Sequence, residues 1–260
     1  MPRPGMMLGC NPRPAGLMAP LLMSKYLSVL TLVPAPEKVY REYKIPDDAW
    51  GMFDNDTIGD CTCAAIAHML MLFTAHTGSI VIPDLKSVID FYSGASGYDP
   101  TKTRPDGSNP TDVGCDLATI LNRWRDVGLC GHKIVQWADI DLTSLEAQKH
   151  GIHIFGATDD AVNLPVSAME QFQANQDWDL LPDDGGNDGG HSVSRFGYGG
   201  DGATCITWAR RQPGSWAWWQ KYLFECTVVI TKDWLNNADG LTPSGFPIDT
   251  LVADLKLLAA

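Results

Sequence analysis

The sequence lacks any long apolar run. No stretch of about 18 consecutive apolar residues occurs, which excludes a helix that crosses a membrane. Residues 1–23 also lack the unbroken apolar segment of a signal peptide, because Pro and Gly interrupt each short apolar stretch. We therefore expect a cytoplasmic protein with no membrane partner.

Positive charge is scarce as well. The 260 residues include 19 Lys and Arg against 31 Asp and Glu, a formal net charge of −12. Nucleic acids attract basic surfaces, and no Lys/Arg run interleaved with aromatic residues is present. Nucleic acid is therefore excluded as the main partner. Hydrophobic residues make up 45% of the chain, which is enough to build a folded core.

The cysteines form no disulfide framework or zinc motif. The chain has seven Cys, an odd number without regular spacing, and only Cys61 and Cys63 lie close together. His150 and His153 are spaced like a metal pair, but no third ligand lies nearby in the sequence. The Asp/Gly run 183–190 lacks the ligand spacing of a calcium loop. The sequence predicts free thiols, no metal and no cofactor.

The first residues read as an arm rather than a folding unit. Residues 1–24 contain five Pro, which interrupt any helical or strand period. Such an arm is held in place either by its own domain or by a neighbouring subunit. We expect residues 25–260 to form one domain, with a helical lobe over about 25–132, a β-rich lobe over 133–240 and a C-terminal tail over 241–260.

Helical patterns precede strand patterns along the chain. Helices are predicted over 61–73, with Asp60 as the N-cap, and over 84–93, 117–128 and 165–174. A loop is predicted over 96–111. Strands are predicted over 133–137, 152–157, 191–198, 203–208 and 223–230. This order is typical of an α+β fold whose two lobes pack around a cleft.

One Cys and one His stand out chemically. Cys61 follows a Gly-Asp turn at the start of a predicted helix, where unpaired N–H groups and the helix dipole stabilise a thiolate. A thiol hydrolase also needs an imidazole from elsewhere, and His191 follows the Gly-rich run 183–190, which we expect to act as a hinge. The alternative is that Cys61 is a small core residue.

The order of several segments resembles the papain-like cysteine peptidases. The resemblance covers about residues 33–235. It rests on the Pro-rich entry at 33–36, on 55–61 ending in Gly-Asp-Cys, on 112–115 with the following helix, on 190–193 and 196–198, and on 205–208 ending in Thr-Trp. The chain is also similar to a group of phage and bacterial proteins that share its Gly-Asp-Cys-Thr-Cys-Ala-Ala and Thr-Trp segments.

The resemblance implies a papain-like α+β fold, with a helical left lobe and a β-barrel-like right lobe. It implies that Cys61 is the nucleophile and His191 its proton shuttle. Thr207 stands where the family has the Asn that orients the His, and its hydroxyl would accept from Nδ1–H. Asn55 stands where the family has its oxyanion-hole Gln. Trp208 would shield the pair from water.

Two functions follow. The first is a thiol hydrolase that acts on peptide or amide bonds of a peptide or protein substrate. The second is a non-catalytic virion protein, a capsid decoration or minor head protein, whose residues 1–24 bind other virion subunits. The second reading draws on the departures from the family at Asn55, Thr207 and Thr62, where an aromatic residue is usual. A phage-encoded chain would then be located in the virion.

Overall fold

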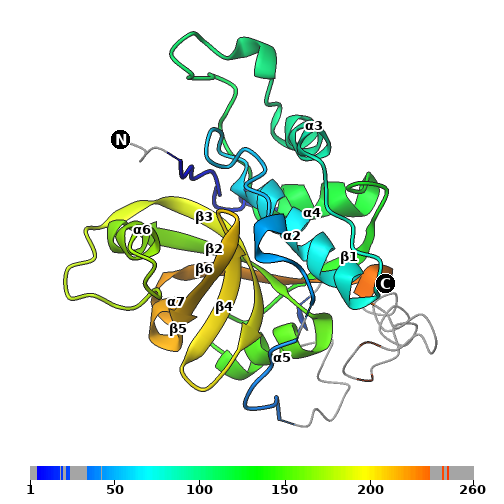
Figure 1. Cartoon of the computed structure of the whole chain (residues 1–260), viewed down its shortest axis with the longest axis vertical. Coiled ribbons are helices and arrows are strands. Elements are labelled where there is room, and N and C mark those ends of the chain that lie inside the picture. Colours follow the sequence, from blue (N-terminus) through cyan, green and yellow to red (C-terminus); the bar gives the residue numbers. More distant parts are fainter. Residues whose placement is uncertain are drawn as a thin grey trace.

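The computed structural model describes residues 5–17, 19, 22–23, 34–41, 43–234, 242 and 245. Most of the predicted tail over 241–260 and of the arm beyond residue 17 therefore lies outside the described residues. Within the described part, helices α2, α3 and α4 gather on one side of a sheet, and α6 and α7 lie away from them (Figure 1). No helix in the described ranges is long and apolar enough to cross a membrane.

The helices and strands have the following bounds. The α-helices are α2 (Cys61–His76), α3 (Leu85–Ser96), α4 (Leu117–Asp126), α5 (Leu145–Phe155), α6 (Val166–Gln173) and α7 (Trp216–Tyr222). The strands are β1 (Ile134–Asp139), β2 (Thr158–Pro165), β3 (Asn187–Tyr198), β4 (Gly202–Thr207), β5 (Arg210–Ser215) and β6 (Leu223–Thr231). Short 3-10 helices are η1 (Asp47–Ala49), η2 (Pro100–Lys102) and η3 (Lys232–Trp234).

The six strands form one antiparallel sheet in the order β1-β6-β2-β3-β4-β5. All six strands come after α4 in the sequence, and helices α5, α6 and α7 lie between them along the chain. Helices precede most of the sheet in the sequence, and the predicted α+β class is confirmed.

Helix α2 is buried along nearly its whole length. Every residue from Cys61 to Thr74 is buried, and the helix packs on β3. The helix begins where predicted, although the Asp60 side chain makes no capping hydrogen bond. The Asp60 carbonyl instead accepts from the N–H groups of Cys63 and Ala64. Cys61 thus lies in the first turn of α2, against β3.

The prediction for residues 152–157 is wrong. This apolar run ends helix α5, which starts after Ser144, whose side chain accepts from the N–H of Ala147. Gly156 closes the helix at a φ of 88°, and strand β2 follows. The alternation of Ile152 and Ile154 resembled a strand, but the two residues lie on opposite faces of a helix that is buried on both, and each packs into a different core cluster.

The β-rich lobe also contains elements that the sequence patterns did not predict. Strand β5 and helix α7 follow β4 directly, and α7 carries Trp216, Trp218 and Trp219, which are all buried. Strand β3 begins at Asn187, so residues 187–190 are strand rather than a hinge loop. His191 therefore projects from a continuous strand.

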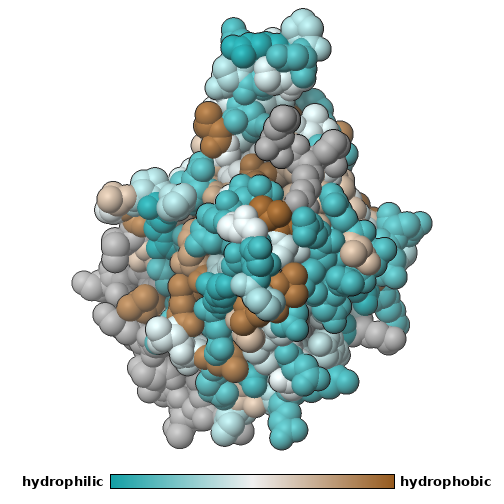
Figure 2. All heavy atoms as spheres, turned by 90° about the vertical axis from the view of Figure 1, so that its left-hand side faces the viewer, coloured by the Kyte–Doolittle hydropathy of each residue, from teal (hydrophilic) through white to brown (hydrophobic). Residues whose placement is uncertain are grey.

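The predicted loop over 96–111 is confirmed, with η2 inside it. Residues 100–108 are all exposed, and Asp99 and Asp106 hold local turns by accepting hydrogen bonds from Thr101 and Ser108. Figure 2 shows that this part projects from the molecule and has a hydrophilic surface. The loop therefore contributes little to the core.

An ion pair lies inside the β-rich lobe. Arg195 Nε of β3 is 2.7 Å from Asp160 Oδ2 of β2, and both side chains are fully buried. Arg195 Nη1 also donates to Gln148 Oε1 at 3.0 Å, and its guanidinium lies over the Trp219 ring. Arg195 therefore joins strand β3 to β2 through Asp160, to α5 through Gln148 and to α7 through Trp219.

We expect Arg195→Ala to lower the free energy of unfolding by about 3–5 kcal/mol, because Asp160 would remain buried without its partner. Lys86→Ala, which breaks the exposed Lys86–Asp90 pair, should change it by less than about 1 kcal/mol. Urea unfolding followed by fluorescence measures both. Equal effects of the two substitutions would contradict this assignment.

Candidate active site

Cys61 lies where α2 meets β3. Its side chain is 1% exposed. Burial raises the pKa of this thiol, and the backbone N–H groups of Ser192, Gly9 and Thr62, which lie against the sulfur, offset only part of that rise. Ser192 directly follows His191, so the structure brings together the two segments that carry the predicted nucleophile and base.

His191 is held from two sides. Its Nε2 lies 2.6 Å from the Thr207 hydroxyl of β4, and its ring stacks on Trp208 at a centroid distance of 4.2 Å and an interplanar angle of 16°. The expected bond from Nδ1 to Thr207 is therefore wrong: the nitrogen involved is Nε2. The buried Nδ1 has no hydrogen-bond partner among the described residues. Nδ1 is thus the ring nitrogen that Thr207 does not contact, and it makes no hydrogen bond to the Cys61 sulfur in this structure.

Both groups are neutral in this structure. Burial raises the pKa of Cys61 to about 12 despite the three backbone N–H groups. Burial likewise lowers the pKa of His191 to about 3. A thiol and a neutral imidazole are therefore the stable forms at neutral pH while the site stays covered. Formation of a thiolate–imidazolium pair requires water or substrate to reach the two side chains.

Asn55 lies in the turn before Cys61 and is 2% exposed. Its side-chain Nδ2 donates to the Ile58 backbone carbonyl at 3.1 Å. The backbone carbonyl of Asn55 accepts from the N–H of Met7. One of its two amide hydrogens is therefore used within the turn. Its role as an oxyanion donor stays a prediction.

Two residues without a predicted role organise this turn. Asp112 accepts from the N–H of Gly59 through both oxygens, at 3.1 and 3.0 Å, and from the Tyr92 hydroxyl at 2.7 Å. The Tyr92 hydroxyl in turn accepts from the N–H of Gly114 at 3.0 Å. Asp112 thus joins the turn before Cys61 to the segment that faces it. The sequence signal was its place in the family-like segment 112–115.

The N-terminal arm crosses directly over the site. The N–H of Cys115 donates to the Gly9 carbonyl at 2.8 Å, and the N–H of Asn11 donates to the Cys115 carbonyl at 3.0 Å. On the opposite side, the N–H of Cys10 donates to the Gly190 carbonyl at 3.0 Å. The arm thus lies in an extended form between the helical lobe and β3. For these residues, the arm is held by its own domain.

Glycine makes this close approach of backbones possible. A Cβ at Gly190 would lie 1.9 Å from the Cys10 carbonyl oxygen, and one at Gly9 would lie 1.9 Å from the Gly59 carbonyl oxygen. Both contacts are far below any real Cβ distance. We call the space between Cys115 and Gly190, beside Cys61, the slot. It admits a peptide main chain at hydrogen-bonding distance on both sides.

The remaining His and Cys residues near these segments pack in the core or lie on helix α5. His68 is 2% exposed, and its Nε2 lies 2.9 Å from the Gly51 carbonyl oxygen. Cys63 is 1% exposed in the core around α2. His150 and His153 both lie on α5, and no group of three or more His, Cys, Asp or Glu in the described ranges is placed to hold a metal.

Comparison with solved structures defines the fold. Xylellain, a cysteine protease from Xylella fastidiosa, matches with a TM-score of 0.64 and 13% identity over 89% of this chain and 98% of its own. ProCathepsin B S9 from Trypanosoma congolense matches with a TM-score of 0.56 and 10% identity over 86% of each chain. No protein-family model and no curated protein matches the sequence. The chain therefore has the papain-like cysteine protease fold.

The burial of Cys61 makes a prediction for alkylation. At pH 8 we expect iodoacetamide to modify Cys130 first, because it is the one exposed cysteine among the seven. Cys61 should react slower than a free thiol by on the order of 10³, since a raised pKa leaves little thiolate. Mass spectrometry of tryptic peptides measures both, with Cys130→Ser as the control. Modification of Cys61 as fast as Cys130 would show that the arm leaves the site open.

The buried His191 predicts acid sensitivity. The unfolded chain binds a proton on this side chain below about pH 6.5, whereas the folded chain does so only below about pH 3. The unfolding free energy should therefore fall by up to about 1.4 kcal/mol per pH unit between these values. His191→Gln should reduce the slope of the unfolding free energy against pH. Part of the slope should remain in this variant, because burial also lowers the pKa of His68, to about 4. Urea unfolding from pH 7 to 4 measures the slopes, and identical slopes would refute the assignment.

Proposed function

We propose that the protein is a thiol hydrolase that cleaves peptide or amide bonds once the arm leaves the slot. The observation that carries the proposal is the placement of His191. Thr207 and Trp208 hold its ring, and the next residue, Ser192, lies against the sulfur of a helix-start cysteine. A nucleophile, a base and a residue that orients the base are the parts that such a reaction needs.

The reaction divides into two halves. His191 Nδ1 takes the proton of the Cys61 thiol, and the sulfur attacks the substrate carbonyl carbon. The N–H of Cys61, with Asn55 as a second donor, stabilises the oxyanion. The tetrahedral intermediate collapses to a thioester as His191 returns the proton to the leaving amine. A water activated by His191 then hydrolyses the thioester and restores the thiol.

The slot supports a peptide as the substrate class. Cys115 offers both its N–H and its carbonyl to an extended chain, and Gly190 offers its carbonyl from the other side. These groups recognise a main chain without regard to its side chains. The arm makes these hydrogen bonds in the structure, so a substrate must displace it or find it displaced.

Activity is best tested on a chain that begins at residue 14, with a quenched-fluorescent peptide library as the substrate. Cys61→Ser should lower kcat/KM by at least about 10³, because the attacking sulfur is lost. Thr207→Ala should lower kcat by about tenfold or more, since the imidazole loses the partner that orients it.

Asp90→Asn, which alters an exposed pair on α3, serves as the matched control. Hydrolysis that survives in the Cys61→Ser chain would assign the activity elsewhere and refute the proposal.

A non-catalytic role is the second candidate. It is favoured by the amide of Asn55, which is engaged within its own turn, and by the covered, neutral Cys61. A virion protein that binds neighbours through residues 1–24 would need the arm to leave the slot. Deletion of residues 1–24 would then leave a folded domain that no longer assembles, which size-exclusion chromatography measures. Unchanged assembly would count against this role.

A further inference from the structure

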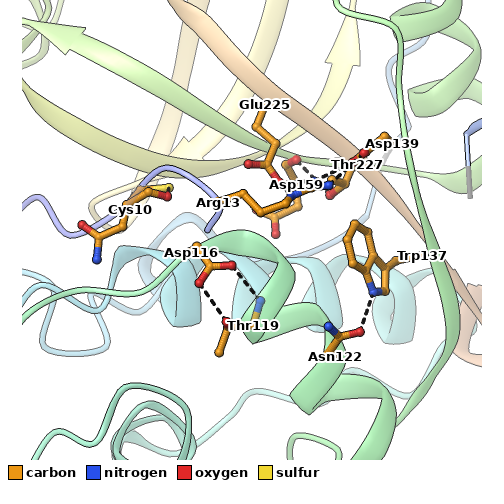
Figure 3. Close-up of polar contacts among 11 residues, drawn as sticks. Cys10, Arg13, Asp116, Thr119, Asn122, Trp137, Asp139, Asp159, Glu225 and Thr227 are labelled. Atoms are coloured by element: carbon orange, nitrogen blue, oxygen red, sulfur yellow. Dashed lines mark hydrogen bonds and ion pairs between the residues drawn. The ribbon is translucent and has the colours of Figure 1, made fainter. Parts of the chain in front are cut away.

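The arm continues past the slot and inserts an arginine side chain into the body of the protein. Nη1 and Nη2 of Arg13 donate to the two carboxylate oxygens of Asp139 at 2.9 and 2.6 Å. Its Nε donates to Glu225 Oε1 at 3.0 Å, and Nη2 contacts the same oxygen. The guanidinium also lies 5.1 Å from the centroid of the Trp137 ring. Figure 3 shows Arg13 surrounded by these side chains.

The pocket that receives Arg13 belongs to the sheet, not to the arm. Trp137 and Asp139 are on β1, Glu225 is on β6, and Asp159 is on the adjacent strand β2. Register places Asp139 and Asp159 on either side of Thr227 of β6. The strands therefore hold this acidic group together whether or not the arm is present.

The pocket presents two carboxylates, Asp139 and Glu225, to one arginine. Burial raises the pKa of a third acidic side chain, Asp159, well above its ordinary value and favours its neutral form. Asp159 is fully buried, and its Oδ2 has no hydrogen-bond partner among the described residues. Figure 3 draws Asp159 beside Arg13, between Glu225 and Asp139. Both carboxylates bond to the same guanidinium, so without a cation Glu225 and Asp139 would lie close together as like charges, an arrangement that favours binding of any basic group that fits.

The pocket also lies next to the proposed reaction centre. The Ser192 hydroxyl, one residue from His191, donates to Asp159 Oδ1 at 3.0 Å. Cys10, over the slot, precedes Arg13 by three residues, which span at most about 10 Å in extended form. A peptide bound in the slot would therefore bring a side chain a few residues from its scissile bond to this pocket.

We propose that Asp139, Glu225 and Trp137 form a specificity pocket for a basic side chain of the peptide substrate, and that Arg13 occupies it as an intramolecular competitor. The inference rests on the proposed hydrolase function. Arginine suits the pocket better than lysine, because a planar guanidinium binds a carboxylate through two hydrogen bonds and stacks on an indole ring.

The test uses the full chain with Arg13→Ala, which vacates the pocket. The substrates are quenched-fluorescent peptides that carry Arg, Lys or Leu at each position within four residues of the cleaved bond. We expect one position at which Arg is preferred over Leu by at least about tenfold in kcat/KM, with Lys in between. The wild-type chain should cleave the same Arg peptide more slowly, because Arg13 competes.

The nearly isosteric substitution Glu225→Gln in the Arg13→Ala chain should lower kcat/KM for the Arg peptide by about tenfold or more and leave the Leu peptide unchanged. Asp139→Asn should act in the same direction, and Asp90→Asn, far from the pocket, should have no effect. Equal cleavage of Arg and Leu peptides by the Arg13→Ala chain would overturn the pocket while leaving the hydrolase intact.

Binding separates this pocket from the hydrolase proposal. In the Cys61→Ser, Arg13→Ala chain, calorimetry should show that the Arg peptide binds at least about tenfold tighter than the Leu peptide. Such binding without cleavage, either by the Arg13→Ala chain or by the chain that begins at residue 14, would support the pocket and refute hydrolysis. Absence of any Arg preference in both binding and cleavage would refute the pocket.

Discussion

The first turn of α2 meets β3 at the Cys61 sulfur, and the rest of the site depends on this contact. The backbone N–H of Ser192 lies against the sulfur, so the segment of β3 that carries His191 contacts the start of α2. Pairing of β3 with β4 then supplies Thr207 and Trp208 on the far side of the imidazole.

Burial sets the chemical state of this site. The arm covers the sulfur with Gly9 and closes the slot with hydrogen bonds to Cys115 and Gly190. The exclusion of water shifts the pKa values of the thiol and the imidazole in opposite directions, so that neither carries charge. The same chain segment therefore fills the slot, pairs Arg13 with the carboxylates of Asp139 and Glu225, and covers the proposed nucleophile.

The order of motifs along the chain predicted the helix at Cys61, the strand at His191 and the place of Thr207 and Trp208 beside the His191 ring. It could not predict which nitrogen of His191 Thr207 would contact, because this depends on the rotation of a ring between two strands. It also missed Asp112 and Tyr92, whose importance comes only from a hydrogen bond to the N–H of Gly59, more than fifty positions from Asp112. Residues 152–157 were assigned to a strand because a short apolar run fits both a strand and a buried helix face.

The sequence by itself determined the class of fold, since helical periodicity, turn residues and the Gly-Asp-Cys segment are local features. It also determined that an arm rich in proline would depend on another surface for its order. Only the tertiary structure decided that this surface is the slot beside Cys61, and that Arg13 meets Asp139 and Glu225. These contacts join residues more than one hundred positions apart, and the pairing of β1, β6 and β2 is what places their charges together.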